Sequence, residues 1–229
     1  MKTNLARIAV LWLPLLSLFL ASCEQDAYEK GEGKYSMMRA DFVEVHADGD
    51  KQLDYALTDD GDSLRIASPV TYRWVATPDS LYRALLYYNK VESGAEAIAC
   101  AQVPTAFVHR EAEFDGGVRQ DPVNFESAWV SRNGRYINFA IILKSGSTDA
   151  EDALHHLGVV GDTIVQNADG TRTYHLRLYH DQGDVPQYYS QHTYFSVPLQ
   201  PYDVDSMRMT IRTYDGDVVR TLCTKSVVQ

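Results

Sequence analysis

Short runs in which apolar and polar residues alternate, each ended by turn residues, follow one another from Tyr35 onward. This period of two is typical of strands that bury one face of a sheet. The clearest run places apolar side chains at every second position, at Ile137, Phe139, Ile141 and Leu143. Only residues 147–157 favour a helix, with Ser147, Thr148 or Asp149 as the N-cap and Gly158 just beyond the end. The pattern therefore predicts a mostly β protein.

Five strand-like runs occupy residues 35–104, with a break between the third and the fourth. Five strands with this spacing suit an OB-like β-barrel. In the first run Met38, Ala40 and Phe42 share one face, whereas Val43 and Val45 share the other. This switch of faces predicts a β-bulge after Phe42.

Residues 105–120 contain the turn residues Asp115, Gly116 and Gly117 and are bracketed by two prolines, so we expect a linker there. The alternation is cleaner in residues 121–229, where polar or amphipathic side chains occupy the face opposite each apolar row. Half-buried antiparallel sheets of this kind pack together in pairs. The sequence therefore predicts an N-terminal OB-like five-stranded barrel followed by a C-terminal antiparallel β-sandwich.

The first 22 residues have the pattern of a signal peptide, with a basic start at Lys2 and Arg7 and an apolar run from Ile8 to Leu20. The run is too short to cross a bilayer comfortably, because a spanning helix needs about 20 apolar residues. Leu20-Ala21-Ser22-Cys23 resembles a bacterial lipobox, which implies cleavage before Cys23 and acylation of its thiol. The alternative is ordinary secretory cleavage near Ser22, which would leave Cys23 as a spare thiol.

Residues 23–34 are rich in acidic residues and glycine and contain little that is apolar, so we expect a flexible tether. We therefore expect the protein to contact the membrane through a lipid on Cys23, as an outer membrane lipoprotein. An acidic run directly after the lipidated cysteine resembles the export signal of surface lipoproteins in some bacteria with two membranes. Two orientations follow, exposure at the cell surface or an orientation facing the periplasm.

Charge and cysteine content add two constraints. The chain has 21 basic and 31 acidic residues, a net charge of -10, which argues against nucleic acid as a partner. Cys100 and Cys223 both lie in strand-like contexts, and the sequence allows either a disulfide between them or two separate buried side chains.

The motifs of common catalytic and metal sites are absent from the sequence. There is no Gly-x-Ser-x-Gly, no thiol beside a histidine and no glycine-rich phosphate loop. His155 and His156 are adjacent and so point in different directions, while His175 and His180 lack the partners of a zinc motif. We therefore expect no enzyme activity, no bound metal and no cofactor.

Tyrosine is abundant, with 15 residues that include two doublets. In a doublet on a strand, one ring enters the core and the other faces outward. Outward rings suit recognition of a protein or a sugar, although tyrosine also fills half-buried strand positions without any such role. The candidate exposed contact residues are Tyr72, Trp74, Tyr87 and Tyr88 in the barrel and Tyr188 and Tyr189 in the sandwich.

Several short motifs in the second half, taken in order, resemble the NigD-like lipoproteins. They are Asp121-Pro122-Val123, Glu126-Ser127-Ala128-Trp129, Tyr136-Ile137-Asn138-Phe139, His156-Leu157-Gly158, Leu178-Tyr179-His180-Asp181, Tyr188-Tyr189, Val197-Pro198-Leu199 and Ile211-Arg212-Thr213-Tyr214-Asp215-Gly216. The resemblance implies a lipoprotein signal, an N-terminal OB-type domain and a C-terminal β-sandwich. The family is named after a bacteriocin-associated locus, and the resemblance implies no catalytic residues.

Two functions agree with these features. The first is a lipid-anchored, non-enzymatic cell-envelope protein that binds another envelope protein. The alternative is a surface lipoprotein that binds carbohydrate through exposed aromatic side chains. Fold alone does not decide between them, because barrels and sandwiches carry many functions.

Overall fold

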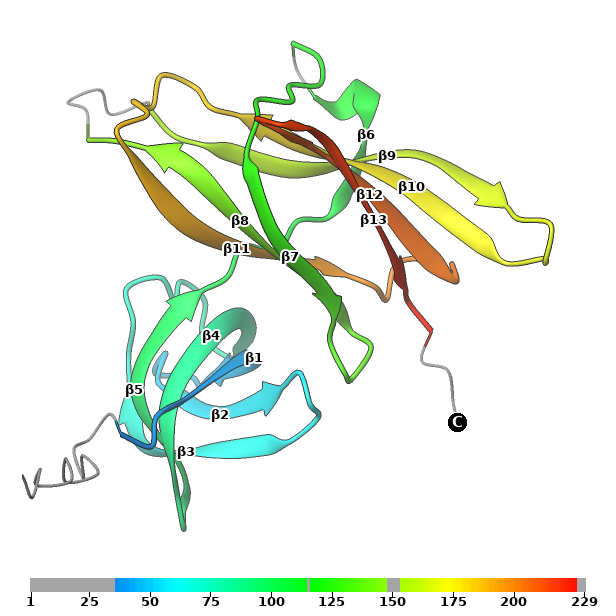
Figure 1. Ribbon diagram of the computed structural model, residues 1–229. Helices are drawn as coiled ribbons and strands as arrows, with labels where there is room; N and C mark the ends of the chain where they lie inside the picture. Colours follow the sequence, from blue (N-terminus) through cyan, green and yellow to red (C-terminus); the bar gives the residue numbers. More distant parts are fainter. Residues whose placement is uncertain (1–35, 115, 148–152, 226–229) are drawn as a thin grey trace, which may run out of the picture. The chain divides into compact units, whose positions relative to one another are not determined.

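The computed structural model describes residues 36–114, 116–147 and 153–225, and Arg39–Gln229 form one compact unit. Nearly all regular structure in these residues is strand, and the one helical segment among them is the short 3₁₀ helix η2 (Glu111–Glu113) (Figure 1). No helix of the described chain is long and apolar enough to span a bilayer. The prediction of a mostly β protein is confirmed, while the signal segment 1–22 and the tether 23–34 lie outside the described residues.

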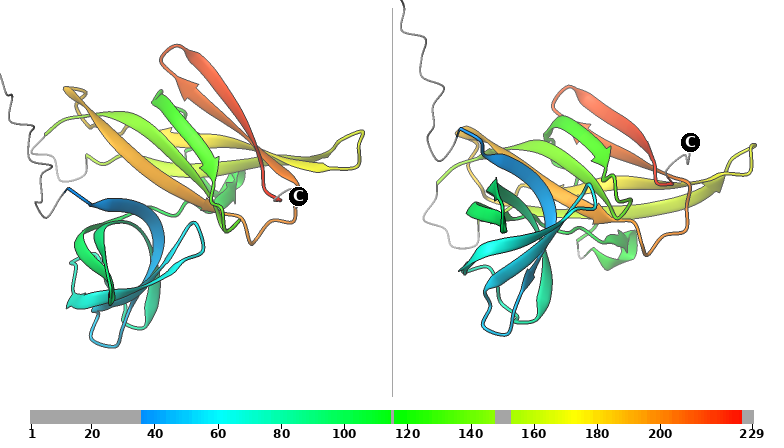
Figure 2. Two further views of the ribbon diagram at one scale, coloured as in Figure 1. Left: turned by 60° about the horizontal axis from the view of Figure 1, so that its bottom comes forward. Right: turned by 90° about the horizontal axis from the view of Figure 1, so that it is seen from below.

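The first five strands close into a barrel. They are β1 (Arg39–Ala47), β2 (Leu53–Thr58), β3 (Ser63–Val70), β4 (Ser80–Val91) and β5 (Gly94–Gln102). Their order around the barrel is β1-β2-β3-β5-β4, with β3 and β5 parallel and the other pairs antiparallel. Figure 2 shows these strands, in blue to green, curling into a ring. This is the OB-like barrel that the spacing of the five runs predicts.

Both faces of β1 are covered, but not because the strand bulges after Phe42. The strand pairs with β4 without interruption from Arg39 to Ala47, so the predicted bulge is wrong. Val43 and Val45 point into the barrel core. Phe42 points the other way and meets the rings of Trp129 and Tyr194, each at 5.4 Å between centroids. Phe42 is therefore apolar although it points out of the barrel, because rings of the second domain cover it.

The remaining strands form two sheets of a sandwich, one with the order β13-β12-β10-β9-β6 and one with the order β11-β8-β7. The strands are β6 (Val108–Arg110), β7 (Asn124–Val130), β8 (Tyr136–Ser145), β9 (His156–Gln166), β10 (Arg172–Asp181), β11 (Tyr189–Pro198), β12 (Ser206–Thr213) and β13 (Gly216–Cys223). The pairs β10–β12 and β6–β9 run parallel, and the other neighbours are antiparallel.

The apolar rows that the sequence predicts for the second half face one another in the sandwich core. Phe139 of β8 stacks on Phe195 of β11, with ring centroids 4.9 Å apart, and both rings are buried. Met207, Met209 and Ile211 of β12 close the core from the other sheet. Each fully buried side chain of this size contributes about 1.5–3 kcal/mol, so this cluster supplies much of the driving force for the domain.

Two predicted elements differ from the structure. Residues 105–120 are not a free linker, because β6 pairs with β9 and Val108 packs against the sandwich core. The predicted helix over 147–157 lies partly outside the described residues, but His156 already belongs to β9 and Gly158 lies within that strand. Val159 and Val160 are β-branched and favour a strand. This preference and the ladder with β10 outweigh the capping signals that favoured a helix over 147–157.

A buried arginine joins the barrel to the sandwich. Arg83 projects outward from β4, yet its side chain is only 2% exposed. Its guanidinium donates two hydrogen bonds of 2.7 Å to the carboxylate of Asp59, which follows β2. It also donates to Asn138 Oδ1 of β8 at 2.8 Å and to Ser196 Oγ of β11 at 3.1 Å. Asn138 in turn donates to Asp59 Oδ2 at 2.8 Å, so the barrel carboxylate is bonded from both domains.

Aromatic and charged side chains surround this network. The Arg83 guanidinium lies 4.2 Å from the centre of the Tyr136 ring, a cation–π contact. The Tyr136 hydroxyl donates to Glu44 of β1 at 2.8 Å, and Glu44 also pairs with Arg135. Burial, followed by the bond to Glu44, raises the pKa of Tyr136 to about 12. Buried charges are tolerated only when they are paired in this way, so the network fixes which surfaces of the two domains meet.

Two histidines form a second buried polar contact, at one end of the sandwich. His180 is 1% exposed, and its Nδ1 lies 3.0 Å from the carbonyl oxygen of Asp121. A donor at that nitrogen leaves Nε2 as an acceptor, 3.0 Å from Nδ1 of His155. Burial lowers the pKa of both imidazoles, and the neighbouring His180 lowers that of His155 further. Both rings are therefore neutral in the folded protein near pH 7.

Replacing Arg83 tests the interdomain network. In Arg83→Met, Asp59 and Asn138 keep their positions but lose their partner, so we expect the free energy of unfolding to fall by about 3 kcal/mol or more. In the control Arg132→Met, which removes an exposed ion pair with Asp60, the loss should stay below about 0.5 kcal/mol. Chemical denaturation of both variants measures the difference, and equal losses would contradict the assigned role of Arg83.

The histidine pair predicts how stability depends on pH. Both folded-state pKa values lie below 6.5, the ordinary value for histidine, so the unfolded chain binds more protons as the pH falls. The free energy of unfolding should thus decrease as the pH falls below about 6.5, and the decrease should be shallower in His155→Leu. Chemical denaturation at several pH values measures how the free energy of unfolding changes with pH. An equal change with pH in His155→Leu and wild type would refute the role of the histidine pair.

Candidate functional site

The structure separates the six aromatic candidates into different environments. Tyr88 is 2% exposed, so the expectation that it is an exposed contact residue is wrong. The register of β4 points it inward beside Ala84 and Leu86, and its hydroxyl donates to Asp41 Oδ2 at 2.8 Å. Burial, followed by that hydrogen bond, raises the pKa of Tyr88 to about 12. Tyr87 is the outward member of this doublet and is half-buried.

Tyr72 and Trp74 lie in the connection between β3 and β4, where they cover the barrel core. Their rings stack at 5.5 Å, and Trp74 meets Tyr82 edge-on at 5.6 Å. Burial raises the pKa of Tyr72 above its ordinary value. Both side chains are half-buried, which suits a packing role better than a wide contact surface.

Tyr188 and Tyr189 are exposed, at 80% and 52% of their surface. Tyr189 is the first residue of β11, and Tyr188 directly precedes it. The two residues are thus adjacent in the chain, at the start of β11. They form the most exposed pair among the six candidates, and we call them the tyrosine pair.

The segment before the tyrosine pair is held by hydrogen bonds. The Gln182 side chain donates to the carbonyl oxygens of Lys144 and Val185, at 2.9 and 3.0 Å. The Tyr188 amide donates to the Ser145 carbonyl oxygen at 2.8 Å. Gly146 lies beneath the ring of Tyr188, because a Cβ at that position would come within 2.8 Å of Tyr188 Cδ2. These contacts thus hold the backbone in place where the tyrosine pair begins.

The strand that carries the tyrosine pair has an open edge. β11 pairs with β8 on one side. On its other side, the described residues supply one bridge, between Thr105 and Ser196 near the strand's far end. The backbone groups that point outward from the first half of β11 can therefore pair with an added strand. Two exposed tyrosines next to an open strand edge can bind a protein segment without any chemical reaction.

The barrel carries a second feature that the sequence did not reveal. A hollow of about 160 Å³ opens between β2 and β3 and is lined by Asp48, Gln52, Leu53, Asp54, Arg65, Ile66, Ala67 and Pro69. The hollow exists because the ladder of paired residues between β2 and β3 is interrupted. The interruption is a property of how the two strands pair. No local pattern in either strand signals such an interruption.

The described residues contain no group of three or more histidine, cysteine or acidic side chains placed to hold a metal ion. Cys100 and Cys223 are both free, so the disulfide that the sequence allowed is not formed. Cys100 is buried, which raises the pKa of its thiol to about 12, whereas Cys223 is exposed. The expectation of two buried thiols therefore holds for Cys100 alone. Cys23 lies outside the described residues.

Several solved structures share this arrangement. A NigD-like immunity protein from Bacteroides caccae is 24% identical, with a TM-score of 0.62 over 80% of this chain and 91% of its own. A candidate toxin-related protein from Parabacteroides distasonis is 19% identical, with a TM-score of 0.62 over 81% and 92%. A candidate lipoprotein from Bacteroides fragilis is 14% identical, with a TM-score of 0.60 over 83% and 99%. At these identities the likeness concerns the fold.

None of these descriptions names an enzymatic activity. A search of curated proteins finds no significant match. Residues 105–224 match the model of the NigD-like C-terminal beta sandwich domain, which covers more than half of the chain and begins just before β6. The chain therefore belongs to the NigD-like family.

Proposed function

We propose that this chain is a lipid-anchored, non-enzymatic cell-envelope protein that binds another protein through the tyrosine pair and the adjoining edge of β11. The observation that carries the proposal is the exposure of Tyr188 and Tyr189, at 80% and 52%. Exposure of large aromatic rings to water is unfavourable in a free protein, and patches of exposed apolar surface often mark interaction sites. Tyrosine also gives a large contact area with few rotatable bonds.

The surroundings of the tyrosine pair favour a protein partner. Next to Tyr189, Ser190 accepts a hydrogen bond from Lys144 at 3.0 Å, and further along β11 His192 contacts Glu126 at 2.9 Å. A polar, mixed-charge rim around aromatic side chains is typical of protein interfaces. The open backbone edge of β11 offers a partner strand hydrogen bonds that a sugar would use less fully.

The membrane part of the proposal rests on the sequence. Cys23 follows an apolar segment and two small residues, as in a lipobox, and a solved protein of similar fold is described as a candidate lipoprotein. Acyl chains on Cys23 would hold the protein at the outer membrane, since two or more chains give stable attachment. We favour exposure at the cell surface, and protease treatment of intact cells distinguishes it from an orientation facing the periplasm.

Carbohydrate binding through Tyr72, Trp74 and Tyr88 loses its basis, because Tyr88 is buried and Tyr72 and Trp74 cover the barrel core. The exposed rings of the tyrosine pair support protein binding better than carbohydrate binding.

The lipid anchor is tested by replacing Cys23. In cells fed radioactive palmitate, the full-length protein should carry label and sediment with membranes, whereas Cys23→Ala should lose both properties because it lacks the acylated thiol. Cys223→Ala, which removes an exposed free thiol elsewhere, should behave like the wild type. Label and sedimentation that persist in Cys23→Ala would reject the anchor.

The binding surface is tested by truncating the tyrosine pair. Crosslinking in intact cells followed by purification of the tagged full-length protein should recover one enriched partner, identified by mass spectrometry. With the purified partner, Tyr188→Ala/Tyr189→Ala should weaken binding by about tenfold or more, because anchor residues of this kind often cost over 1 kcal/mol when truncated. Tyr214→Ala, at another exposed tyrosine of the sandwich, should leave the Kd unchanged. Equal affinity in all three proteins would overturn the proposed surface.

A further inference from the structure

The hollow on the barrel results from a break in the β2–β3 ladder. Tyr55 pairs with Arg65, but the next pair along is Leu53 with Val70. Residues 66–69 therefore stand opposite Asp54 alone, which parts the two strands. Their separation opens the space of about 160 Å³. Its floor is apolar, because Leu53 and Ile66 belong to the barrel core.

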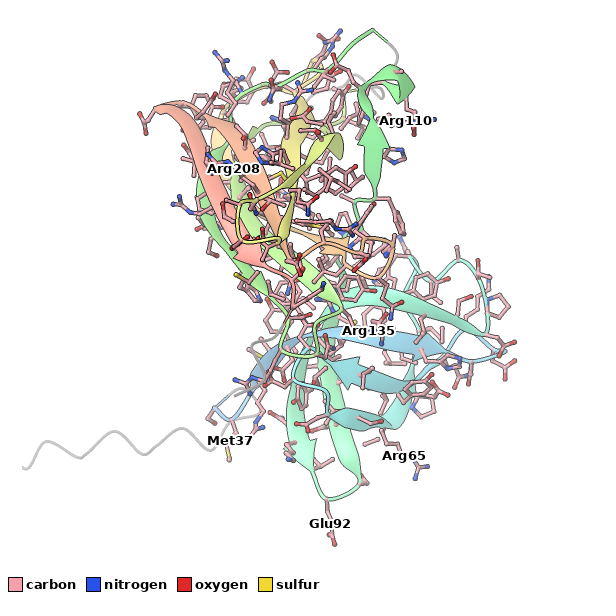
Figure 3. All side chains as sticks on the ribbon, turned by 90° about the vertical axis from the view of Figure 1, so that its right-hand side faces the viewer. Met37, Arg65, Glu92, Arg110, Arg135 and Arg208 are labelled. Carbon is pink, nitrogen blue, oxygen red and sulfur yellow. The ribbon has the colours of Figure 1, made fainter. Side chains whose placement is uncertain are left out.

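Polar groups of complementary kinds line the hollow. Asp54 supplies a carboxylate, which His46 holds in place through a 2.8 Å contact between Nδ1 and Oδ1. Asp48 supplies a second carboxylate, whose Oδ1 accepts hydrogen bonds from two amides of its own turn. Arg65 projects from the barrel surface (Figure 3), and its guanidinium forms no ion pair or hydrogen bond with any described residue. The hollow thus combines fixed acceptors with an unpaired donor.

An aromatic surface adjoins these groups. The ring of Tyr55 stacks on the imidazole of His46, with centroids 4.8 Å apart and planes inclined by 13°. Tyr55 is partly exposed and lies directly opposite Arg65 in the ladder. Asp54 connects the two features, because it lines the hollow and also contacts His46. A flat ring beside a small polar hollow suits a ligand that has one apolar face and several hydroxyl groups.

Size and charge narrow the class of ligand. The hollow of about 160 Å³ is smaller than the usual pocket for a drug-sized ligand, roughly 300–1,000 Å³, so it suits a small group such as one sugar ring. Two carboxylates beside one guanidinium, in a chain of net charge -10, disfavour an anionic ligand. Hydroxyl groups, in contrast, donate to carboxylates and accept from a guanidinium at the same time.

We propose that the hollow between β2 and β3 binds a neutral sugar ring, with Asp54 and Arg65 bonding its hydroxyl groups and Tyr55 covering its apolar face. The site is distinct from the tyrosine pair and does not depend on it. It gives the protein a second ligand, a glycan, in addition to the proposed protein partner.

Nuclear magnetic resonance titration of the isotope-labelled full-length chain, kept in a zwitterionic detergent that contains no sugar, tests this proposal. The probes are glucose, galactose, mannose and N-acetylglucosamine, each added separately up to saturation. At least one should shift the amide signals of residues 53–55 and 65–67 in a saturable way. Arg65→Met should weaken that sugar's binding by about tenfold or more, since it removes a charged donor. The exposed control Arg73→Met, in the β3–β4 connection of the same barrel, should not.

Three outcomes overturn the proposal: no saturable shift with any of the four sugars, shifts confined to other residues, or equal affinity in wild type and Arg65→Met. Arg65 is exposed, so its replacement should leave the fold intact, and the unperturbed signals of the sandwich verify this in the same spectra. The result is independent of partner capture through Tyr188 and Tyr189, so failure of either proposal leaves the other standing.

Discussion

The ion pair between Arg83 and Asp59 is the constraint on which the arrangement of the two domains depends. An arginine that is almost fully buried needs partners for its charge and its donors, and one domain alone does not supply them. Asp59 comes from the barrel, whereas Asn138 and Ser196 come from the sandwich. Such a pair adds little stability compared with an apolar contact, but it makes a mismatched contact costly. It therefore favours one docking of barrel on sandwich over the alternatives.

The periodic parts of this fold could be predicted from the sequence, because each strand records which of its faces is covered. Ile137, Phe139 and Ile141 alternate in the sequence and lie in the sandwich core. The alternation of apolar and polar residues does not show which other part of the chain covers the outward face of a strand. Phe42 and Asn138 both point out of their own domains and are nevertheless covered by the other domain. Reading Phe42 as a sign of a bulge was wrong for this reason, since the covering surface is distant in the sequence.

The candidate sites illustrate the same limit. Tyr87-Tyr88 and Tyr188-Tyr189 are identical doublets, yet the first lies within a strand and the second at the start of one. Within β4 the register sends Tyr88 into the core, whereas the turn before β11 leaves both rings exposed. The hollow beside Arg65 depends on a register jump between two strands, and β6 depends on a parallel partner far along the chain. These features arise from pairing between strands, which single-sequence periodicity does not encode.

The Arg83 network holds the barrel and the sandwich together, and the tyrosine pair and the barrel hollow are the surfaces that we propose for binding. The central claim is that Arg83 acts together with Asp59 rather than as an isolated side chain. A double-mutant cycle with Arg83→Met and Asp59→Leu, followed by chemical denaturation, tests it most directly. We expect the double variant to lose less stability than the two single losses combined, with a coupling of about 2 kcal/mol, because it no longer contains an unpaired buried charge. Additive losses would contradict the account.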